Sequence, residues 1–302
     1  MRYVATLVAA DRLAEDLISA AASELRNGSP NGGSPNGTDP DWLAPGKACD
    51  LQLEVADPET ARAILARSVE GHGVDFAVQE REGRRKRLLV ADMESTMIRN
   101  EMIDELAELA GIRSRVEAVT EQAMNGEIDF DGALRVRVEL LVGLPVTALE
   151  QAGERLEIEA GARELVATMR RHGAMTALVT GGFGCFADKV RAELGLDRQH
   201  SNELMVTDGR ICGRLREPIL DGDAKLSILL ALCAELGIPP EQAAAVGDGA
   251  NDLPMLAAAG LGVAFHGKPI VAAAASFRVD HGDLKALLYF QGYREDEIVR
   301  QP

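Results

Sequence analysis

The 302-residue sequence is poor in cysteine, in aromatic residues and in positive charge. Its few cysteines are far apart and form no Cys-x-x-Cys pair, which argues against a zinc site or a disulfide framework. They are Cys49, Cys185, Cys212 and Cys233. We expect small buried thiols in a reducing compartment.

Basic residues are outnumbered by acidic ones, 32 against 48, which gives a formal net charge of −16. Nucleic-acid binding is therefore not expected as the main task, because it depends on neutralising phosphates with Lys and Arg. An acidic surface also repels anionic ligands at long range, so any phosphate must be bound by cations close to it.

Long hydrophobic runs are missing too. No stretch approaches the ~20 apolar residues of a membrane-spanning helix, so no membrane contact is expected. The apolar run within MRYVATLVAADRL is too short for a signal peptide, and Asp11 follows it closely. These features predict a cytoplasmic protein.

The length suggests about two domains. The first 82 residues predict a small α+β domain in the order β-α-β-α-β. Its strands are expected at 2–9, 50–55 and 74–80, and its helices at 14–26 and 58–71. Between the first helix and the second strand, NGSPNGGSPNGTDP (27–40) has a composition that cannot pack and predicts a disordered loop. The charged segment REGRRKR (81–87) indicates a linker at the domain boundary.

From Arg87 the pattern changes to short, continuously apolar strands that alternate with helices, which is typical of a parallel sheet covered on both faces. The strands are RLLVAD (87–92), AMTALVT (174–180), AAAVGD (243–248) and LGVAF (261–265). Three of them end at Asp92, Thr180 and Asp248. In open α/β sheets ligands bind at that edge.

Residues 100–159 interrupt this α/β core, 83–99 and 160–302, with amphipathic helical patterns and no strand signal. Such a block predicts a helical cap over the strand ends. Further along, ELMVTDGRICGRLREPI (203–219) predicts a β-hairpin with Asp208-Gly209 at its turn.

The polar residues at the expected strand ends suit phosphoryl transfer. Asp92 can attack phosphorus as a nucleophile, and Glu94 can donate and then accept the proton. Because two anions must meet, Mg²⁺ held by Asp92 and Asp248 fits the chemistry. Thr180, the Gly181 amide and Lys225 would neutralise the phosphate oxygens, and Asp252 would orient the metal waters or Lys225.

These segments, in this order, resemble the four motifs of the haloacid dehalogenase superfamily. MIRNEMIDELAELAG, AMNGEIDFDGALRVRVELL, VTGGF and GDGANDLPMLAAAG are similar to the phosphoserine phosphatase family within it. The resemblance covers roughly residues 84–293. It implies a Rossmann-like parallel sheet with a helical cap inserted after the first core strand, and hydrolysis of O-phospho-L-serine in serine biosynthesis.

The resemblance also assigns roles to individual residues. It implies Asp92 as the nucleophile, Glu94 as the acid/base, and a Mg²⁺ site formed by Asp92, Asp248 and the backbone carbonyl of Glu94. For the substrate it implies Glu101 at the amino group and Arg137 at the carboxylate, with Arg135 left solvated. The remaining substrate contacts are Met124, Phe130, Thr180, Gly181, Lys225 and Asn251. Met124 and Phe130 rest on the resemblance alone.

Glu94 departs from the family pattern, which has aspartate there. Glutamate is one methylene longer, and a displacement of about an ångström can lower a rate about a hundredfold. Three interpretations remain: a tolerated variant, a slower or substrate-altered phosphatase, and a nearly inactive protein.

The first 82 residues are similar to ACT-type regulatory domains. Serine binding, formation of a homodimer and a purely structural role all remain open for them. For the whole chain the alternatives are a phosphatase or phosphotransferase for phosphohomoserine or phosphothreonine, and an amino-acid-binding regulator whose catalytic site is impaired.

Overall fold

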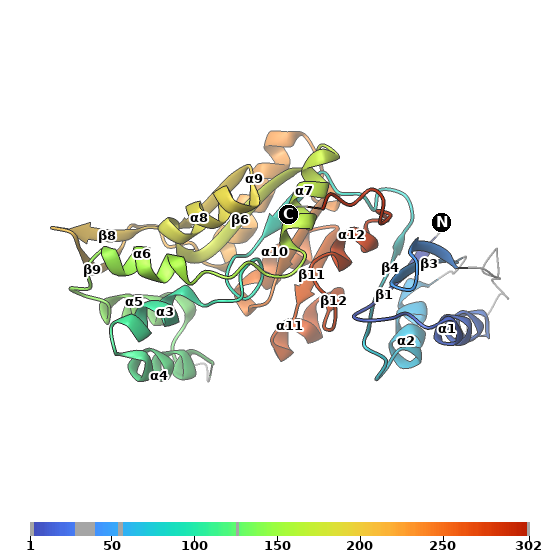
Figure 1. The fold of residues 1–302 in the computed structure, drawn as a ribbon, viewed down its shortest axis with the longest axis horizontal. Helices are drawn as coiled ribbons and strands as arrows, with labels where there is room; N and C mark the ends of the chain where they lie inside the picture. Colours follow the sequence, from blue (N-terminus) through green and yellow to red (C-terminus); the bar gives the residue numbers. More distant parts are fainter. Residues whose placement is uncertain (1–2, 28–39, 54–56, 125–126, 301–302) are drawn as a thin grey trace.

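The computed structural model describes residues 3–27, 40–53, 57–124 and 127–300. Figure 1 shows a central α/β core with a helical insertion at one end and a small N-terminal sheet at the other. No helix in these residues is long and apolar enough to cross a membrane.

The N-terminal sheet has four antiparallel strands in the order β2-β3-β1-β4. They are β1 (Tyr3–Ala9), β2 (Asp41–Ala44), β3 (Ala48–Leu53) and β4 (Val74–Glu80). The helices α1 (Glu15–Asn27) and α2 (Pro58–Ser68) pack on one face around a single apolar cluster. The sequence-based order β-α-β-α-β is therefore incomplete. It omitted β2, because DWLA is short, does not alternate and follows the Gly/Pro/Ser segment. That segment lies almost entirely outside the described residues.

The core is a six-stranded parallel sheet in the order β12-β11-β10-β5-β6-β7. Its strands are β5 (Leu88–Ala91), β6 (Met175–Phe183), β7 (Arg198–Asn202), β10 (Ala243–Gly247), β11 (Leu261–Phe265) and β12 (Phe277–Val279). The parallel sheet was predicted. Its two edge strands, β7 and β12, were not, because RQHSN is polar and FRV is only three residues long.

Both faces of this sheet are buried, as the continuously apolar strands predicted. Leu89 and Ala91 of β5 face one apolar cluster, and Leu88 and Val90 face another. The first cluster includes α7 (Ala162–Arg171), α8 (Gly184–Leu194) and α12 (Ala286–Phe290). The second includes α9 (Gly222–Leu236), α10 (Leu253–Ala258) and α11 (Pro269–Ala274). Short 3-10 turns lie at Pro240–Gln242 (η1) and Ala250–Asp252 (η2).

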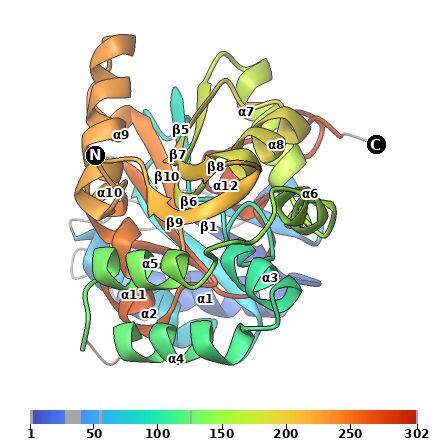
Figure 2. The same cartoon turned by 90° about the vertical axis from the view of Figure 1, so that its left-hand side faces the viewer.

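The insertion after β5 is helical. It contains α3 (Met102–Leu109), α4 (Arg113–Met124), α5 (Phe130–Glu139) and α6 (Thr147–Glu154), the last of which was not foreseen. Figure 2 shows α3, α4 and α5 grouped on one side of the core sheet. The hairpin of β8 (Leu204–Thr207) and β9 (Arg210–Leu215) packs against α5 and turns at Asp208 and Gly209. Both turn residues have positive φ, 52° and 70°, as the Asp-Gly pair predicted.

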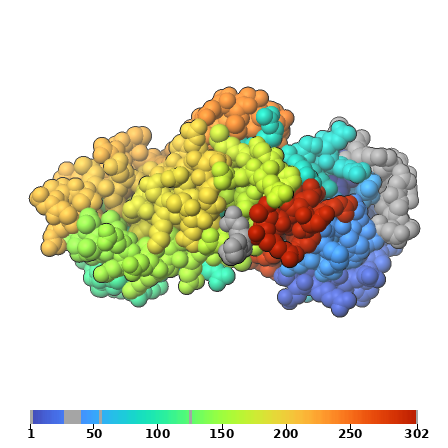
Figure 3. All heavy atoms as spheres, turned by 45° about the horizontal axis from the view of Figure 1, so that its top comes forward, coloured from blue at the N-terminus to red at the C-terminus, as the bar shows by residue number. Residues whose placement is uncertain are grey.

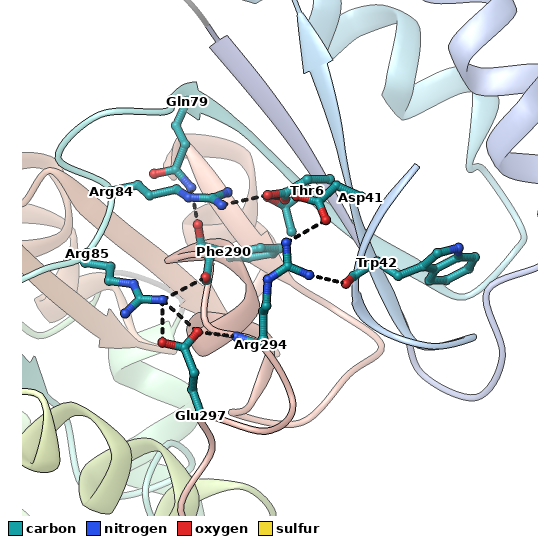
Figure 4. Close-up of polar contacts among 11 residues, drawn as sticks. Thr6, Asp41, Trp42, Gln79, Arg84, Arg85, Phe290, Arg294 and Glu297 are labelled. Atoms are coloured by element: carbon teal, nitrogen blue, oxygen red, sulfur yellow. Dashed lines mark hydrogen bonds and ion pairs between the residues drawn. The ribbon is translucent and has the colours of Figure 1, made fainter. Parts of the chain in front are cut away.

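The second face of the N-terminal sheet is covered by the end of the chain. Val8 and Ala77 belong to the same apolar cluster as Leu287 of α12. Around it, the Gln79 side-chain amide donates to the Phe290 carbonyl (2.7 Å), and Arg294 bonds Asp41 and the Trp42 carbonyl (Figure 4). In Figure 3 the red C-terminal segment lies directly against the N-terminal region.

All four cysteines are free. The expectation of buried thiols holds for Cys49 and Cys233 but is wrong for Cys185, which is exposed on α8, and only partly right for Cys212.

Candidate active site

Three neighbouring strands bring the predicted polar residues to one edge of the core sheet. β5 lies between β10 and β6, so Asp92, Asp248 and Thr180 line the same cavity. The cavity has a volume of about 1080 Å³. Its opposite wall comes from α4, α5 and the start of α3, so it lies between the core and the helical insertion.

A buried lysine joins two of the acidic residues. The Lys225 ammonium donates to Asp92 Oδ1 and to Asp252 Oδ1, each at 2.6 Å, and its side chain is fully buried. Asp252 Oδ2 accepts from the Gly249 N–H at 2.9 Å, so both oxygens of Asp252 have partners. Lys225 lies in the first turn of α9, where Asp221 caps the helix by accepting from the Ala224 N–H.

Burial and like charges disfavour ionisation of the acidic residues here. Burial, opposed by Lys225 and assisted by Asp252, raises the pKa of Asp92 to about 7. Burial likewise raises the pKa of Asp248 to about 6, against the opposing effect of Lys268. Burial lowers the pKa of Lys225, but its two carboxylate partners raise it more, so the net shift is upward and the lysine stays charged.

The carboxylates suit a divalent cation. Asp92, Asp248 and Asp252 each offer an oxygen within 4.8 Å of the others. Because Asp252 is occupied by Lys225 and Gly249, the ligand oxygens that remain belong to Asp92 and Asp248. Hard carboxylate oxygens and excess negative charge are what magnesium-type sites provide. The donor set therefore fits a divalent cation.

Glu94 reaches toward the helical insertion. Its Oε1 accepts from the Met102 N–H at the start of α3 (3.0 Å), and its Oε2 lies against Gly182, where a methyl group would be only 2.6 Å away. Burial, together with the charges of Glu101 and Asp92, raises the pKa of Glu94 to about 8. The carboxyl group is therefore mostly protonated at neutral pH.

The helical insertion contributes both charges expected for substrate recognition. Glu101 and Arg137 line the cavity, and the Ser95 hydroxyl donates to Glu101 Oε1 at 2.8 Å. Arg137 comes from α5 and bonds the Ala133 carbonyl, whereas Arg135 is exposed and pairs with Glu217. Of these two arginines, only Arg137 lines the cavity.

β6 extends past Thr180 to Phe183, so Thr180 lies inside a strand and not at its end as predicted. The Thr180 hydroxyl accepts from the Gly182 N–H at 2.9 Å. Phe130 approaches Gly181 so closely that a methyl group there would be 2.8 Å from the ring. A side chain at position 181 would therefore force the Phe130 ring to move, and glycine permits the close contact between the core and α5.

Three predicted site residues remain: Asn251, Lys225 and Met124. Asn251, in η2, lines the cavity, whereas Lys225 does not line it and contacts the cavity wall through Asp92. Met124 ends α4, and its side chain is outside what is described.

Sequence reasoning missed Lys268. Its ammonium lies 3.1 Å from Asp248 Oδ2, and it lines the cavity three residues after the end of β11. The signal available was its position just beyond an apolar strand whose carboxyl end meets the other strand ends.

Known proteins resemble this chain over the same region. Residues 86–260 match the family model "Hydrolase: haloacid dehalogenase-like hydrolase". The sequence is 44% identical over 217 residues, 71% of the chain, to a phosphoserine phosphatase from Archaeoglobus fulgidus, of which it spans 63%. The chain spans less than two thirds of the length of the first curated relatives it matches.

Two solved structures are also similar to this chain. A HAD family hydrolase from Salmonella enterica serovar Typhi has a TM-score of 0.83 at 28% identity, covering 98% of this chain and 99% of that one. A phospho-aspartyl intermediate analogue of phosphoserine phosphatase has a TM-score of 0.65 at 38% identity, covering 68% and 99%.

Proposed function

Because the chain belongs to the haloacid dehalogenase-like hydrolases, we propose that it hydrolyses O-phospho-L-serine to L-serine and phosphate through an aspartyl phosphate, an acyl phosphate formed on Asp92. One observation carries this proposal. A carboxylate paired with a fully buried lysine lies at the floor of a cavity whose opposite wall offers one anion, Glu101, and one cation, Arg137.

In the first step an oxygen of Asp92 attacks phosphorus and the bond to the serine oxygen breaks. Lys225 holds Asp92 in place by its bond to Oδ1. Glu94 donates its proton to the departing alkoxide, a role suited to a carboxyl group whose pKa is about 8. In the second step the ionised Glu94 takes a proton from the water that attacks the phosphorus, which restores Asp92.

The phosphate requires positive charge and N–H donors. We assign this task to Thr180, the Gly181 amide and Asn251, which line the cavity, with Lys225 beneath them. We propose Mg²⁺ as the divalent cation, held by Asp92, Asp248 and the Glu94 carbonyl, with Asp252 orienting Lys225. The cation would supply charge that stabilises the phosphate oxygens.

The amino-acid part of the substrate is a zwitterion. We assign its ammonium group to Glu101 and its carboxylate to Arg137, since the guanidinium group binds carboxylates in a bidentate manner. Phe130 and Met124 would close the cavity. We regard Glu94 as a tolerated variant, because its longer side chain reaches the Met102 N–H without leaving the cavity.

We propose three domains: residues 1–82, the core of 83–99 and 160–302, and a cap of 100–159. The strand order β2-β3-β1-β4 with both helices on one face supports an ACT-like N-terminal domain. Serine binding there, a homodimer and a cytoplasmic location stay predictions.

The function is tested by phosphate release from phosphoserine with and without Mg²⁺. We expect Mg²⁺-dependent release that is lost by about 10³-fold or more in Asp92→Asn, because amide nitrogen and oxygen do not replace the nucleophile. Release equal to that of Asp92→Asn would refute the proposal.

Substrate class is tested by comparing phosphoserine with phosphothreonine, phosphohomoserine and a phosphate ester that lacks the carboxylate. Arg137→Ala should lower kcat/KM for phosphoserine by about 10- to 100-fold, from loss of a charge-assisted contact of about 1.5–3 kcal/mol. It should leave the ester without a carboxylate nearly unaffected. An equal loss on both substrates would assign Arg137 to the fold and not to the substrate.

A further inference from the structure

Asp75 of the N-terminal sheet is bonded to the core. It is the second residue of β4 and is only 4% exposed. Its Oδ1 accepts from the N–H groups of Asp280 and His281, at 2.8 and 3.2 Å, and its Oδ2 from that of Gly282, at 2.7 Å. Three consecutive backbone N–H groups thus enclose one carboxylate, which fixes the turn after β12.

The same turn holds the end of β11. The Gly282 carbonyl accepts a hydrogen bond from His266 Nε2 at 3.0 Å, and the His266 N–H donates to the Val279 carbonyl at 2.8 Å. His266 has a φ of 43°, a left-handed conformation that costs energy for a residue with a side chain. The two hydrogen bonds therefore hold the backbone of His266 in a conformation that it would not adopt without them.

The chain runs from the strained His266 directly into the catalytic cavity. Two positions later the Lys268 N–H donates to the Asp248 carbonyl at 3.1 Å, and the Lys268 ammonium lies 3.1 Å from Asp248 Oδ2. His266 and Lys268 are both exposed, so this segment has little burial to fix it. Its position depends on these hydrogen bonds.

We propose that Asp75 is a positioning residue of the catalytic site, which acts through Gly282 and His266 to hold Lys268 against Asp248. The proposal rests on the proposed function in so far as Asp248 serves phosphoryl transfer. It gives the N-terminal sheet a task in catalysis that requires no ligand bound to that sheet.

A plainer alternative is that Asp75 only docks the two parts of the chain. Asp50 separates the two ideas because it is also 4% exposed and lies at the same interface. Its carboxylate oxygens bond the Thr6 hydroxyl and Arg84, both at 2.6 Å, and neither partner belongs to the turn after β12. Asp50→Asn is therefore the matched control.

The decisive comparison is Asp75→Asn against Asp50→Asn in the full chain. The substitution at position 75 replaces one carboxylate oxygen by an amide N–H donor, which would face a backbone N–H, so at least one bond to the turn is lost. We expect the affinity for Mg²⁺, measured by calorimetry, to rise about three- to tenfold in Asp75→Asn, because a displaced Lys268 ammonium competes less with the cation for Asp248. Hydrogen exchange of the amides at 266–268 should accelerate. Asp50→Asn should change neither, even if both variants lower Tm.

Two variants of His266 test the connection itself. His266→Gly accepts the positive φ without strain but removes the ring bond to Gly282. His266→Ala removes the bond and keeps the strain. Both should strengthen Mg²⁺ binding, and adding Asp75→Asn to His266→Gly should strengthen it little further, because the two residues act in series. Wild-type Mg²⁺ affinity in either Asp75→Asn or His266→Gly would overturn the proposal.

These readouts do not depend on the substrate. If phosphoserine is not hydrolysed but Mg²⁺ affinity changes as described, the proposed function fails and the role of Asp75 stands. If phosphoserine is hydrolysed and Asp75→Asn alters neither Mg²⁺ affinity nor exchange, the reverse holds.

Discussion

The core has two flanks that differ in how their polar groups are used. Toward the helical insertion it leaves a cavity of about 1080 Å³ in which Glu94, Glu101 and Arg137 face one another. Toward the N-terminal sheet it forms a closed contact in which Gln79, Arg84 and Arg294 have partners (Figure 4).

The difference indicates which flank serves a ligand. Acidic groups that raise one another's pKa repel each other and lower the stability of the folded protein. A fold retains such groups where a bound ligand or cation compensates for the repulsion. The Asp75 turn differs from the rest of the closed flank, because its hydrogen bonds continue from the N-terminal sheet toward the catalytic cavity.

After replacement of the nucleophile, the largest effect on the open flank is expected from Glu94→Gln. Glutamine can still accept from the Met102 N–H, so the start of α3 should be preserved, but it cannot donate a proton as an acid. We expect kcat to fall by about 10²- to 10⁴-fold. Unfolding curves are the control and should stay near those of the wild type.

The same residue predicts a pH profile. The raised pKa of about 8 keeps Glu94 protonated below that pH, so leaving-group protonation should be lost as the pH rises through it. A rate limited by the first step should therefore decline on the alkaline side. Persistence of this alkaline decline in Glu94→Gln would assign it to another group.

A smaller effect on the open flank concerns stability. Asp92, Glu94 and Asp248 have folded-state pKa values of about 7, 8 and 6, above their ordinary values near 4. The folded protein therefore binds more protons than the unfolded chain between about pH 4 and 8, and without a divalent cation its stability should fall as the pH rises.

Mg²⁺ should reverse this loss. At a hundredfold excess over its dissociation constant it should add about 2.7 kcal/mol at pH 8, and distinctly less at pH 5, where the carboxyl groups are protonated. Thermal unfolding at both pH values measures the difference. An equal gain at the two pH values would contradict the assignment of the cation to these carboxylates.

The smallest effect is expected on the closed flank. Arg294 and Asp41 form a half-exposed ion pair, with 47% and 41% of their side chains accessible. Arg294→Ala should lower the free energy of unfolding by less than about 1 kcal/mol and leave kcat and KM unchanged. A change in KM would link this flank to the catalytic site by a second route.

The sequence alone predicted those secondary-structure elements whose own residues show a characteristic pattern. The apolar runs around Leu89 and Val246 predicted the parallel sheet, and Asp208-Gly209 predicted the hairpin turn. β2, β7 and β12 were missed because tertiary pairing, and not local pattern, makes those segments strands.

The same division applies to the site. Asp92 and Asp248 follow apolar strands and Thr180 follows the apolar run within β6, so their convergence on one cavity could be predicted. Lys268 also follows an apolar strand, but its contact with Asp248 involves the positive φ of His266, which the sequence does not reveal. The contact between Phe130 and Gly181 likewise depends on how two distant segments pack.

The contact of α12 with the N-terminal sheet has a consequence for synthesis on the ribosome. Ala77, the later of the two residues, is made roughly 200 residues before Leu287, which covers both Val8 and Ala77. At about 5–20 residues per second, one apolar face of the nascent sheet stays uncovered for roughly 10–40 s. Chaperones that bind exposed apolar surface therefore have their best opportunity on this segment, before translation is finished.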